Sequence, residues 1–241
     1  MLLLGSRRML GASAVSTEES RRAAANVWLR RRNVEIEAAT LFRGMARSME
    51  RFSWPSVLVD AAIKAAEDEC VHAELCDSLV SILDPALVKS TIPEPRAIRF
   101  KTEIALLHTA VSVGCVTESM SCALLIRMKK STTDSDCKRV VSAVLRDEVS
   151  HSRIGWESLR HCNNRMDVRW VQTRLSQMCQ MATTSEIADL NQSHLDLSLY
   201  GILPKLEGAR IVEDTINEVI VPGVATVIGE GTRHGLALGA G

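Results

Sequence analysis

The sequence predicts an all-α protein made of two helical hairpins joined by a longer connection, with additional helices towards the C-terminus. Strand signals are scarce, because only 3% of the residues are aromatic and no stretch alternates cleanly between apolar and polar residues. Apolar residues recur instead at helical spacing over long stretches. They make up 46% of the 241 residues, which is enough to bury a sizeable core.

Prolines and polar clusters set the limits of the predicted helices. Ser53-Trp54-Pro55 ends the first helix and starts the second, and Ser131-Thr132-Thr133-Asp134 separates the third from the fourth. Three prolines mark residues 84–96 as a crossover linker, because proline disfavours helix at the position before it. The four long helices are therefore expected at residues 18–52, 55–83, 97–130 and 135–162.

The C-terminal part is less regular. Helices are expected from Met166 to Met181 and from Pro204 to Ile220, and Pro222-Gly223 is expected to stop the second of them. Residues 182–203 show no clear pattern. The predicted organisation is a flexible N-terminus at 1–17, a metal-binding four-helix bundle at 18–162, a C-terminal helical extension at 163–228 and a disordered tail at 229–241.

Charge and cysteine content argue against several functions. Lys and Arg total 29, as do Asp and Glu, so no net charge favours nucleic acid or a membrane surface, and neither partner is expected. No apolar run approaches the roughly 20 residues that span a bilayer. Seven cysteines without a Cys-x-x-Cys pair indicate free thiols and a cytoplasmic location. A basic cluster in the first helix is interpreted as a solvated face: Arg21, Arg22, Arg30, Arg31 and Arg32.

A repeated motif indicates the chemistry. Asp68-Glu69-Cys70-Val71-His72 and Asp147-Glu148-Val149-Ser150-His151 each contain Glu-x-x-His preceded by Asp, and each lies in the second helix of its hairpin. Residues three apart share one face of a helix, so one Glu and one His can reach the same metal ion. The two copies predict a duplicated hairpin that builds one symmetric site.

The other two helices are expected to supply one carboxylate each, as a di-metal site in a helical bundle requires. Glu118 lies 30 residues before Glu148, and Glu35 lies 34 residues before Glu69. The apolar stripe of the first helix continues back to Glu35, which makes Glu35 the preferred ligand. Glu37 remains the alternative on that helix.

These candidate ligands interrupt apolar stripes that should face the core. Burying an unpaired carboxylate costs on the order of several kcal/mol even after relaxation. Two divalent cations would neutralise four carboxylates, which makes a two-metal site the favoured interpretation. The predicted metal ligands, which are also the predicted catalytic residues, are Glu35, Glu69, His72, Glu118, Glu148 and His151.

The Asp that precedes each motif is predicted to support a ligand from across the bundle. Asp68 is expected to accept a hydrogen bond from the free ring nitrogen of His151, and Asp147 from that of His72. Such partners fix the tautomer of a metal-ligating histidine and raise its basicity. The alternative for each Asp is a charge on the helix surface.

With these residues in place, the chain resembles the ferritin-like superfamily of di-iron carboxylate proteins over roughly residues 30–160. The stretches at 113–118 and 146–156 are most similar to uncharacterised bacterial ferritin-like proteins. The resemblance implies a ferritin-like four-helix bundle that holds two iron ions, with manganese or an iron–manganese pair as alternatives. It also implies that one or two of the Glu ligands bridge the metals.

The expected function is an O₂-dependent oxidase or oxygenase that acts on a small organic substrate and takes electrons from an external donor. A ferroxidase or a rubrerythrin-like peroxide scavenger is the alternative, and a bundle that has lost catalysis is the third interpretation. A tyrosyl-radical reductase is disfavoured, because the sole tyrosine, Tyr200, lies beyond the four helices. The assembly state is left open, with a homodimer as one option.

Small residues near the ligands have two interpretations. Val111, Cys115, Cys122 and Gly155 are expected to line a channel for the substrate. The set of small residues either leaves room for that substrate or allows the helices to pack closely, and it consists of Ala65, Ala66, Gly114, Ser119 and Gly155.

Overall fold

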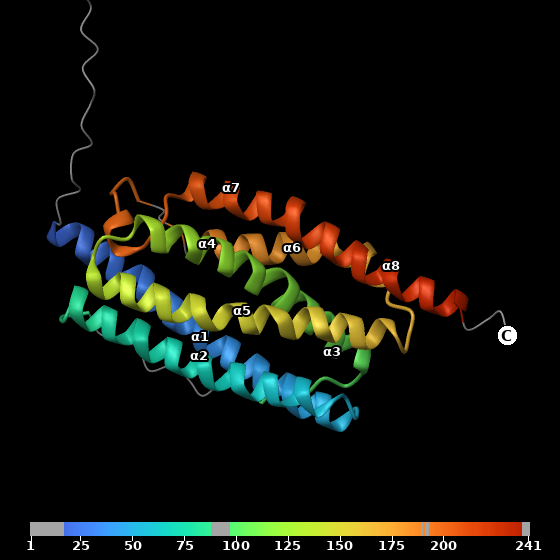
Figure 1. Ribbon diagram of the computed structural model, residues 1–241. Coiled ribbons are helices and arrows are strands. Elements are labelled where there is room, and N and C mark those ends of the chain that lie inside the picture. Colours follow the sequence, from blue (N-terminus) through green and yellow to red (C-terminus); the bar gives the residue numbers. More distant parts are fainter. Residues whose placement is uncertain (1–16, 88–96, 189, 191–192, 238–241) are drawn as a thin grey trace, which may run out of the picture.

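The computed structural model describes residues 17–87, 97–188, 190 and 193–237, and the regular structure in these residues is helical (Figure 1). The predicted all-α class is confirmed, since no strand occurs in this part of the chain. The elements are α1 (Glu18–Arg51), α2 (Ser56–Leu83), α3 (Glu103–Ala110), η1 (Val111–Thr117), α4 (Glu118–Ser131), α5 (Ser135–Asn163), α6 (Trp170–Ala188), η2 (Ser198–Tyr200), α7 (Lys205–Thr215), η3 (Ile216–Ile220) and α8 (Val221–Ala237).

The first two helices form an antiparallel hairpin with nearly the predicted limits. The Thr17 hydroxyl caps α1 by accepting a hydrogen bond from the backbone N–H of Ser20. Ser53 in the turn has a φ of 58°, which lies in the left-handed region. Pro55 directly precedes α2, where its fixed φ suits the start of a helix. The rest of the predicted flexible N-terminus, residues 1–16, lies outside the described residues.

The third predicted helix is present as one run that passes from α3 through η1 into α4. It begins at Glu103 rather than at Ala97, because Thr102 caps it and its hydroxyl accepts a hydrogen bond from Ala105 N–H at 3.1 Å. The η1 segment is a π-helix, in which backbone hydrogen bonds span five residues instead of four. Apolar spacing alone does not predict this change of winding.

The two ends of the connection between the hairpins lie at opposite ends of α1. At the start of α1, Arg21 donates a hydrogen bond to the carbonyl of Ile82 at 2.8 Å. At the end of α1, Arg51 donates one to the carbonyl of Phe100. Since the 34 residues of α1 span about 50 Å, the two ends of the connection lie far apart, as a crossover requires. Residues 88–96 of the predicted linker lie outside the described residues.

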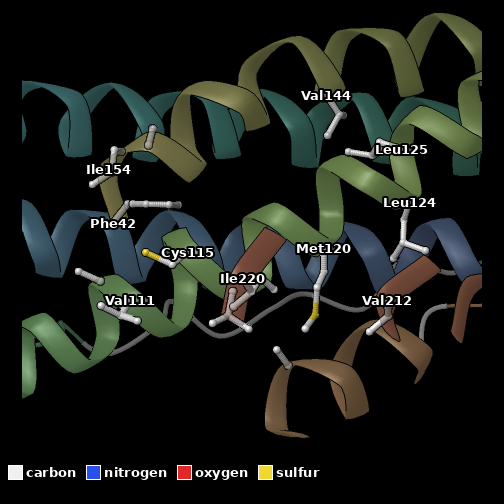
Figure 2. Packing of buried hydrophobic residues seen from close by; sticks show 14 of the residues in the cluster. Phe42, Val111, Cys115, Met120, Leu124, Leu125, Val144, Ile154, Val212 and Ile220 are labelled. Atoms are coloured by element: carbon white, nitrogen blue, oxygen red, sulfur yellow. The ribbon is translucent and has the colours of Figure 1, made fainter. Parts of the chain in front are cut away.

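The fourth long helix, α5, packs against α2, η1 and α4. Asp134 caps it by accepting hydrogen bonds from the backbone N–H groups of Asp136 and Cys137. Apolar side chains fill the space between these helices, and Figure 2 shows Leu125 and Val144 within this core. The helices therefore enclose a continuous interior in which the candidate ligands lie.

The helix Glu103–Ser131 is the one helix of the described residues that is long and apolar enough to cross a membrane. We expected no apolar run long enough to span a bilayer, and this helix differs from that expectation by its length and composition. However, 61% of its most apolar window is buried inside the protein. Burial against neighbouring helices explains its composition, as for a core helix of a soluble protein.

The C-terminal helices cover the bundle on the side of α4 and η1 (Figure 1). α6 ends at Ala188, beyond the predicted limit at Met181. Pro222-Gly223 does not stop a helix, because the π-turn η3 directly precedes it and π-turns rearrange the backbone hydrogen bonds that proline disrupts. α8 then continues to Ala237, through much of the predicted disordered tail.

Gly223 has a packing role in α8. A Cβ at this position would lie 2.7 Å from Cη2 of Trp156 on α5, so glycine allows α8 to approach that ring. This contact gives the early part of α8 a tertiary anchor that helix propensity does not predict. Residues 238–241 lie outside the described residues.

Candidate metal centre

Six side chains from four helices meet in the interior of the protein. All are buried, with exposed fractions between 0 and 5%. The two residues of each Glu-x-x-His motif face the same point, as their spacing on a helix predicts. The six are Glu35 from α1, Glu69 and His72 from α2, Glu118 from α4, and Glu148 and His151 from α5.

The donor atoms form two overlapping groups of four. Within each group, the chosen donor atoms all lie within 4.8 Å of one another, a spacing that could hold a metal ion. Glu69 and Glu148 belong to both groups, so their carboxylates lie between the two. Glu35 and His72 complete the first group, and Glu118 and His151 complete the second.

Both histidines turn Nδ1 into the cluster. His72 Nδ1 lies 3.1 Å from Glu69 Oε2. His151 Nδ1 lies 3.1 Å from Glu148 Oε2 and 3.0 Å from Glu69 Oε1. The ring centroids of His72 and His151 are 5.8 Å apart. Nδ1 is therefore the ring atom that each histidine presents to the carboxylates.

The opposite ring nitrogens face the two aspartates, in the reciprocal pairing that the sequence predicts. His72 Nε2 lies 3.3 Å from Asp147 Oδ2, which accepts a hydrogen bond from the ring. His151 Nε2 lies 3.5 Å from Asp68 Oδ2 but makes no hydrogen bond among the described residues. Each aspartate also pairs with a surface cation, Asp68 with Lys64 and Asp147 with Arg146. The hydrogen bond between His72 and Asp147 is thus formed, whereas His151 and Asp68 lie slightly further apart and form none.

Burial makes two of the carboxyl groups hard to ionise. It raises the pKa of Glu35 well above its ordinary value, although the guanidinium of Arg31 opposes this effect. Burial likewise raises the pKa of Glu118, and the nearby Glu148 carboxylate raises it further. The four carboxylates can therefore share the interior as anions only if cations join them.

Hydrogen bonds shift two other groups towards their charged forms. Burial tends to raise the pKa of Glu69, but hydrogen bonds from His151 and His72 outweigh it and lower this pKa to about 2. Burial tends to lower the pKa of His151, but hydrogen bonds to Glu148 and Glu69 raise it to about 10. Protons on the imidazoles thus offset part of the carboxylate charge when metals do not.

Arg31 belongs to the site, and its interpretation as part of a solvated face is wrong. Its Nε lies 3.0 Å from Glu35 Oε1, and its side chain is only 16% exposed. The neighbouring Arg32 pairs with Asp77 at 3.2 Å instead. The spacing of four residues between Arg31 and Glu35 is the signal that could have identified this pair in the sequence. The surrounding run of arginines obscured it.

The structure distinguishes the two candidate ligands on α1. Glu35 is 4% exposed and lies in the donor cluster. Glu37 is exposed and lines a neighbouring cavity instead of joining the donor cluster. The continuation of the apolar stripe thus indicated the residue that the fold buries.

A cavity of about 210 Å³ adjoins the cluster. Four of the candidate ligands reach its wall, and α1, η1, α4 and α6 supply the rest. Val111, Cys115, Cys122 and Gly155 are not among its lining residues, so the prediction that they line the space for a substrate is wrong for this cavity. Val111 and Cys115 are fully buried in the apolar core, where Figure 2 shows them. The sequence could not predict the contribution of α6, because it depends on packing between distant segments.

Gly114 and Gly155 allow close packing instead of leaving space for a substrate. A Cβ at Gly114 would lie 2.5 Å from the backbone nitrogen of Gly155, and a Cβ at Gly155 would lie 2.4 Å from that of Cys115. Ala65 and Ala66 are each 1% exposed within the core. Ser119 and Ser152 join α4 to α5 through their hydroxyls at 3.2 Å. For the glycines, the packing interpretation is the one that the structure supports.

The π-helical segment lies immediately before Glu118. The Thr117 hydroxyl donates a hydrogen bond to the carbonyl of Ser112 at 3.1 Å, across the wider turn. Val113 and Thr117 from this segment line the cavity beside the cluster. A π-turn within an α-helix is frequent at functional sites, and here it lies at the start of α4, which carries the candidate ligand Glu118.

Other sequence predictions have direct counterparts in the structure. All seven cysteines are free thiols. Tyr200 lies in η2, and its backbone carbonyl accepts a hydrogen bond from the indole of Trp28 at 3.2 Å. This contact fastens the C-terminal extension to α1.

Comparison with known proteins finds no matching family model, no matching curated protein and no matching solved structure.

Proposed function

We propose that this chain is a ferritin-like di-iron protein that uses O₂ to oxidise a small organic substrate. The observation that supports the proposal most strongly is the pair of overlapping, buried donor groups that share Glu69 and Glu148. Two hairpins with a crossover connection, each with one Glu-x-x-His motif, are the layout in which ferritin-like proteins hold two metals.

The donor set fits two divalent cations. Four carboxylates carry four negative charges, which two divalent ions neutralise. Carboxylate oxygens and imidazole nitrogens together suit iron or manganese better than softer metals. Glu35 and His72 would hold one ion and Glu118 and His151 the other, with Glu69 and Glu148 shared between them.

The residues around the donors have distinct roles in this proposal. Iron ions held by these donors would supply electrons to O₂. Asp147 orients the His72 ring, because its carboxylate accepts the Nε2 proton and leaves Nδ1 free to ligate. Arg31 holds the Glu35 carboxylate from the outer side. The 210 Å³ cavity places a small molecule beside the donors while the surrounding helices restrict access by water.

Iron handling without an organic substrate is the second candidate function. Glu37 and Glu186 both line the cavity, and Glu37 is exposed to solvent. Acidic side chains at the mouth of a cavity raise the local concentration of cations. Such a path would suit a ferroxidase or a peroxide scavenger that takes up Fe²⁺ from solution.

The metal content of matched variants tests the proposal. The purified protein should bind about two Fe²⁺ or Mn²⁺ ions per chain, as measured by elemental analysis. Glu118→Gln keeps the side-chain volume and should reduce the content. Glu74→Gln on the exposed face of α2 is the control and should change nothing. A well-folded chain that binds neither metal would refute the proposal.

Oxygen consumption separates the two functions. After metal loading, an oxidase should consume O₂ faster when its organic substrate is present. A ferroxidase should consume it in proportion to added Fe²⁺ whether or not an organic compound is present. The two candidates thus predict different dependences in one oxygen-electrode experiment.

A further inference from the structure

We propose that the cavity beside the metal centre binds a small organic acid, and that the guanidinium of Arg31 holds the carboxylate of that acid. This inference rests on the proposed function, because it names the substrate class for the same site. Its basis is the position of one largely buried cation on the wall of a small, partly apolar cavity.

Arg31 has hydrogen-bonding capacity beyond its contacts with the described residues. Its Nε lies 3.0 Å from Glu35 Oε1, and one terminal nitrogen donates to the Ser121 hydroxyl at 3.4 Å. A guanidinium has five N–H groups in a planar fork, so these two contacts, which are those to the part of the chain that the structure describes, leave three N–H groups for a ligand. That fork matches the two oxygens of a carboxylate.

The cavity limits the size of the ligand. Its volume of about 210 Å³ lies below the range of ordinary ligand pockets. It exceeds the roughly 150 Å³ of an engineered cavity that binds benzene. An acid of the size of benzoate therefore fits, whereas a nucleotide or a long-chain lipid does not.

The cavity wall suits an amphipathic molecule. Val34, Leu41 and Val113 give it an apolar portion, and the hydroxyl residues Thr117 and Ser121 lie among them. A hydrocarbon or aromatic body would contact the apolar side chains, while the acid group would pair with the arginine. The same wall includes candidate metal ligands, so the body of the bound acid would lie beside the metal centre.

Charge balance favours a singly charged anion. Two divalent ions neutralise the four glutamates of the centre, which leaves Arg31 as the cation of the described cavity wall that can pair with one added anion. Glu186 on α6 lies on the same wall and would compete with such an anion for Arg31. Glu37 on the same wall is exposed, so solvent screens its charge. A phosphate dianion would exceed the charge that one guanidinium offsets.

Calorimetric titration of the manganese-loaded protein with three probes of similar shape tests the inference. We expect benzoate to bind at least tenfold more tightly than benzamide or benzylamine, because only benzoate pairs with a guanidinium. Paramagnetic broadening of the benzoate proton signals by Mn²⁺ should show that the ring lies beside the metals. Equal binding of the amide, or tighter binding of the amine, would overturn the inference without any variant.

Substitutions then identify the group that holds the acid. Arg31→Met should weaken benzoate binding by roughly tenfold to a hundredfold. Glu186→Gln should strengthen it, because a competing anion is removed. Arg30→Met replaces the exposed neighbouring arginine and should leave it unchanged. Undiminished binding to folded Arg31→Met would show that the acid binds the metals directly, which contradicts the proposed role of Arg31.

Metal content and benzoate binding distinguish failure of this inference from failure of the proposed function. Two bound manganese ions without benzoate binding would overturn the acid-binding role alone. Benzoate binding that depends on Arg31 in a chain that holds no metal would refute the proposed metal centre and leave the acid site established. Absence of both would refute both.

Discussion

The backbones of Gly114 and Gly155 are in contact where η1 crosses α5. A Cβ on either glycine would lie within 2.6 Å of backbone atoms in the other helix. Glu118 follows one glycine by four residues, and His151 precedes the other by four. The contact therefore fixes the separation of two helices that each supply candidate ligands to the same donor group.

Gly155→Ala should destabilise the protein strongly. The added methyl group overlaps backbone atoms that cannot move independently, so we expect a loss of about 3 kcal/mol. For a chain of this size, that loss corresponds to a fall in Tm of roughly 6–12 °C, measurable by calorimetry. Gly229→Ala is the control, since a Cβ there meets nothing within 4 Å. A similar Tm for both variants would contradict the close contact.

Asp147→Asn should weaken metal binding while the fold survives. The change removes the carboxylate that accepts the His72 Nε2 proton, and loss of such a partner typically costs about 10- to 100-fold in metal affinity. Competition with a chelator measures the effect. Asp136→Asn on the exposed start of α5 should have none. Asp68→Asn should have a smaller effect, because Asp68 lies 3.5 Å from its histidine without a hydrogen bond.

Substitution of a carboxylate that belongs to both donor groups should release more metal than substitution of a carboxylate that belongs to one group. Glu69→Gln alters a ligand that belongs to both donor groups, so we expect both ions to be lost. Glu35→Gln alters a ligand that belongs to one group, so about one ion per chain should remain. Manganese titration followed by electron paramagnetic resonance would give both stoichiometries. Equal losses in the two variants would show that the groups do not share ligands as described.

The metal-free protein should lose stability as the pH rises. The pKa of Glu35 and of Glu118 is raised in the folded state, so this state binds more protons than the unfolded chain above about pH 4.5. The stability that the raised pKa of His151 contributes is likewise lost as the pH rises towards its folded value of about 10. Glu69 acts oppositely, and its contribution is lost below pH 4.5 towards its pKa of about 2.

Denaturant unfolding with a chelator present should therefore show stability falling from about pH 5 to about pH 9. With Mn²⁺, the stabilisation by metal should grow over the same range, because metals bind deprotonated ligands. The metal-free Glu118→Gln variant should show a shallower pH dependence than Glu74→Gln. A metal-free protein that becomes more stable towards pH 9 would contradict the raised pKa values.

The sequence predicted the features that depend on helical periodicity. The interrupted apolar stripes identified the six residues that the structure brings together, and they favoured Glu35 over Glu37. The duplicated motif predicted which aspartate faces which histidine, because two related hairpins place Asp68 and His151 across from each other.

The features that the sequence did not predict depend on contacts between distant segments. Arg31 appeared as one of several exposed arginines, because a charge run does not show which member turns inward. The π-turn before Glu118 has no signature in apolar spacing. The cavity could not be placed, because Ser185 and Glu186 on its wall come from α6, whose packing was not predictable.

The donor residues and the α6 part of the cavity wall lie in different regions of the sequence. In the proposed site, the four helices that carry the donors would determine which ions bind, whereas α6 contributes Ser185 and Glu186 to the wall of the cavity beside them. Under the proposed function, a descendant that kept residues 18–162 and replaced α6 would still bind metals, but the part of the cavity wall formed by Ser185 and Glu186 would differ. Part of any change in the bound molecule would therefore arise in the C-terminal third of the chain, which contains neither Glu-x-x-His motif.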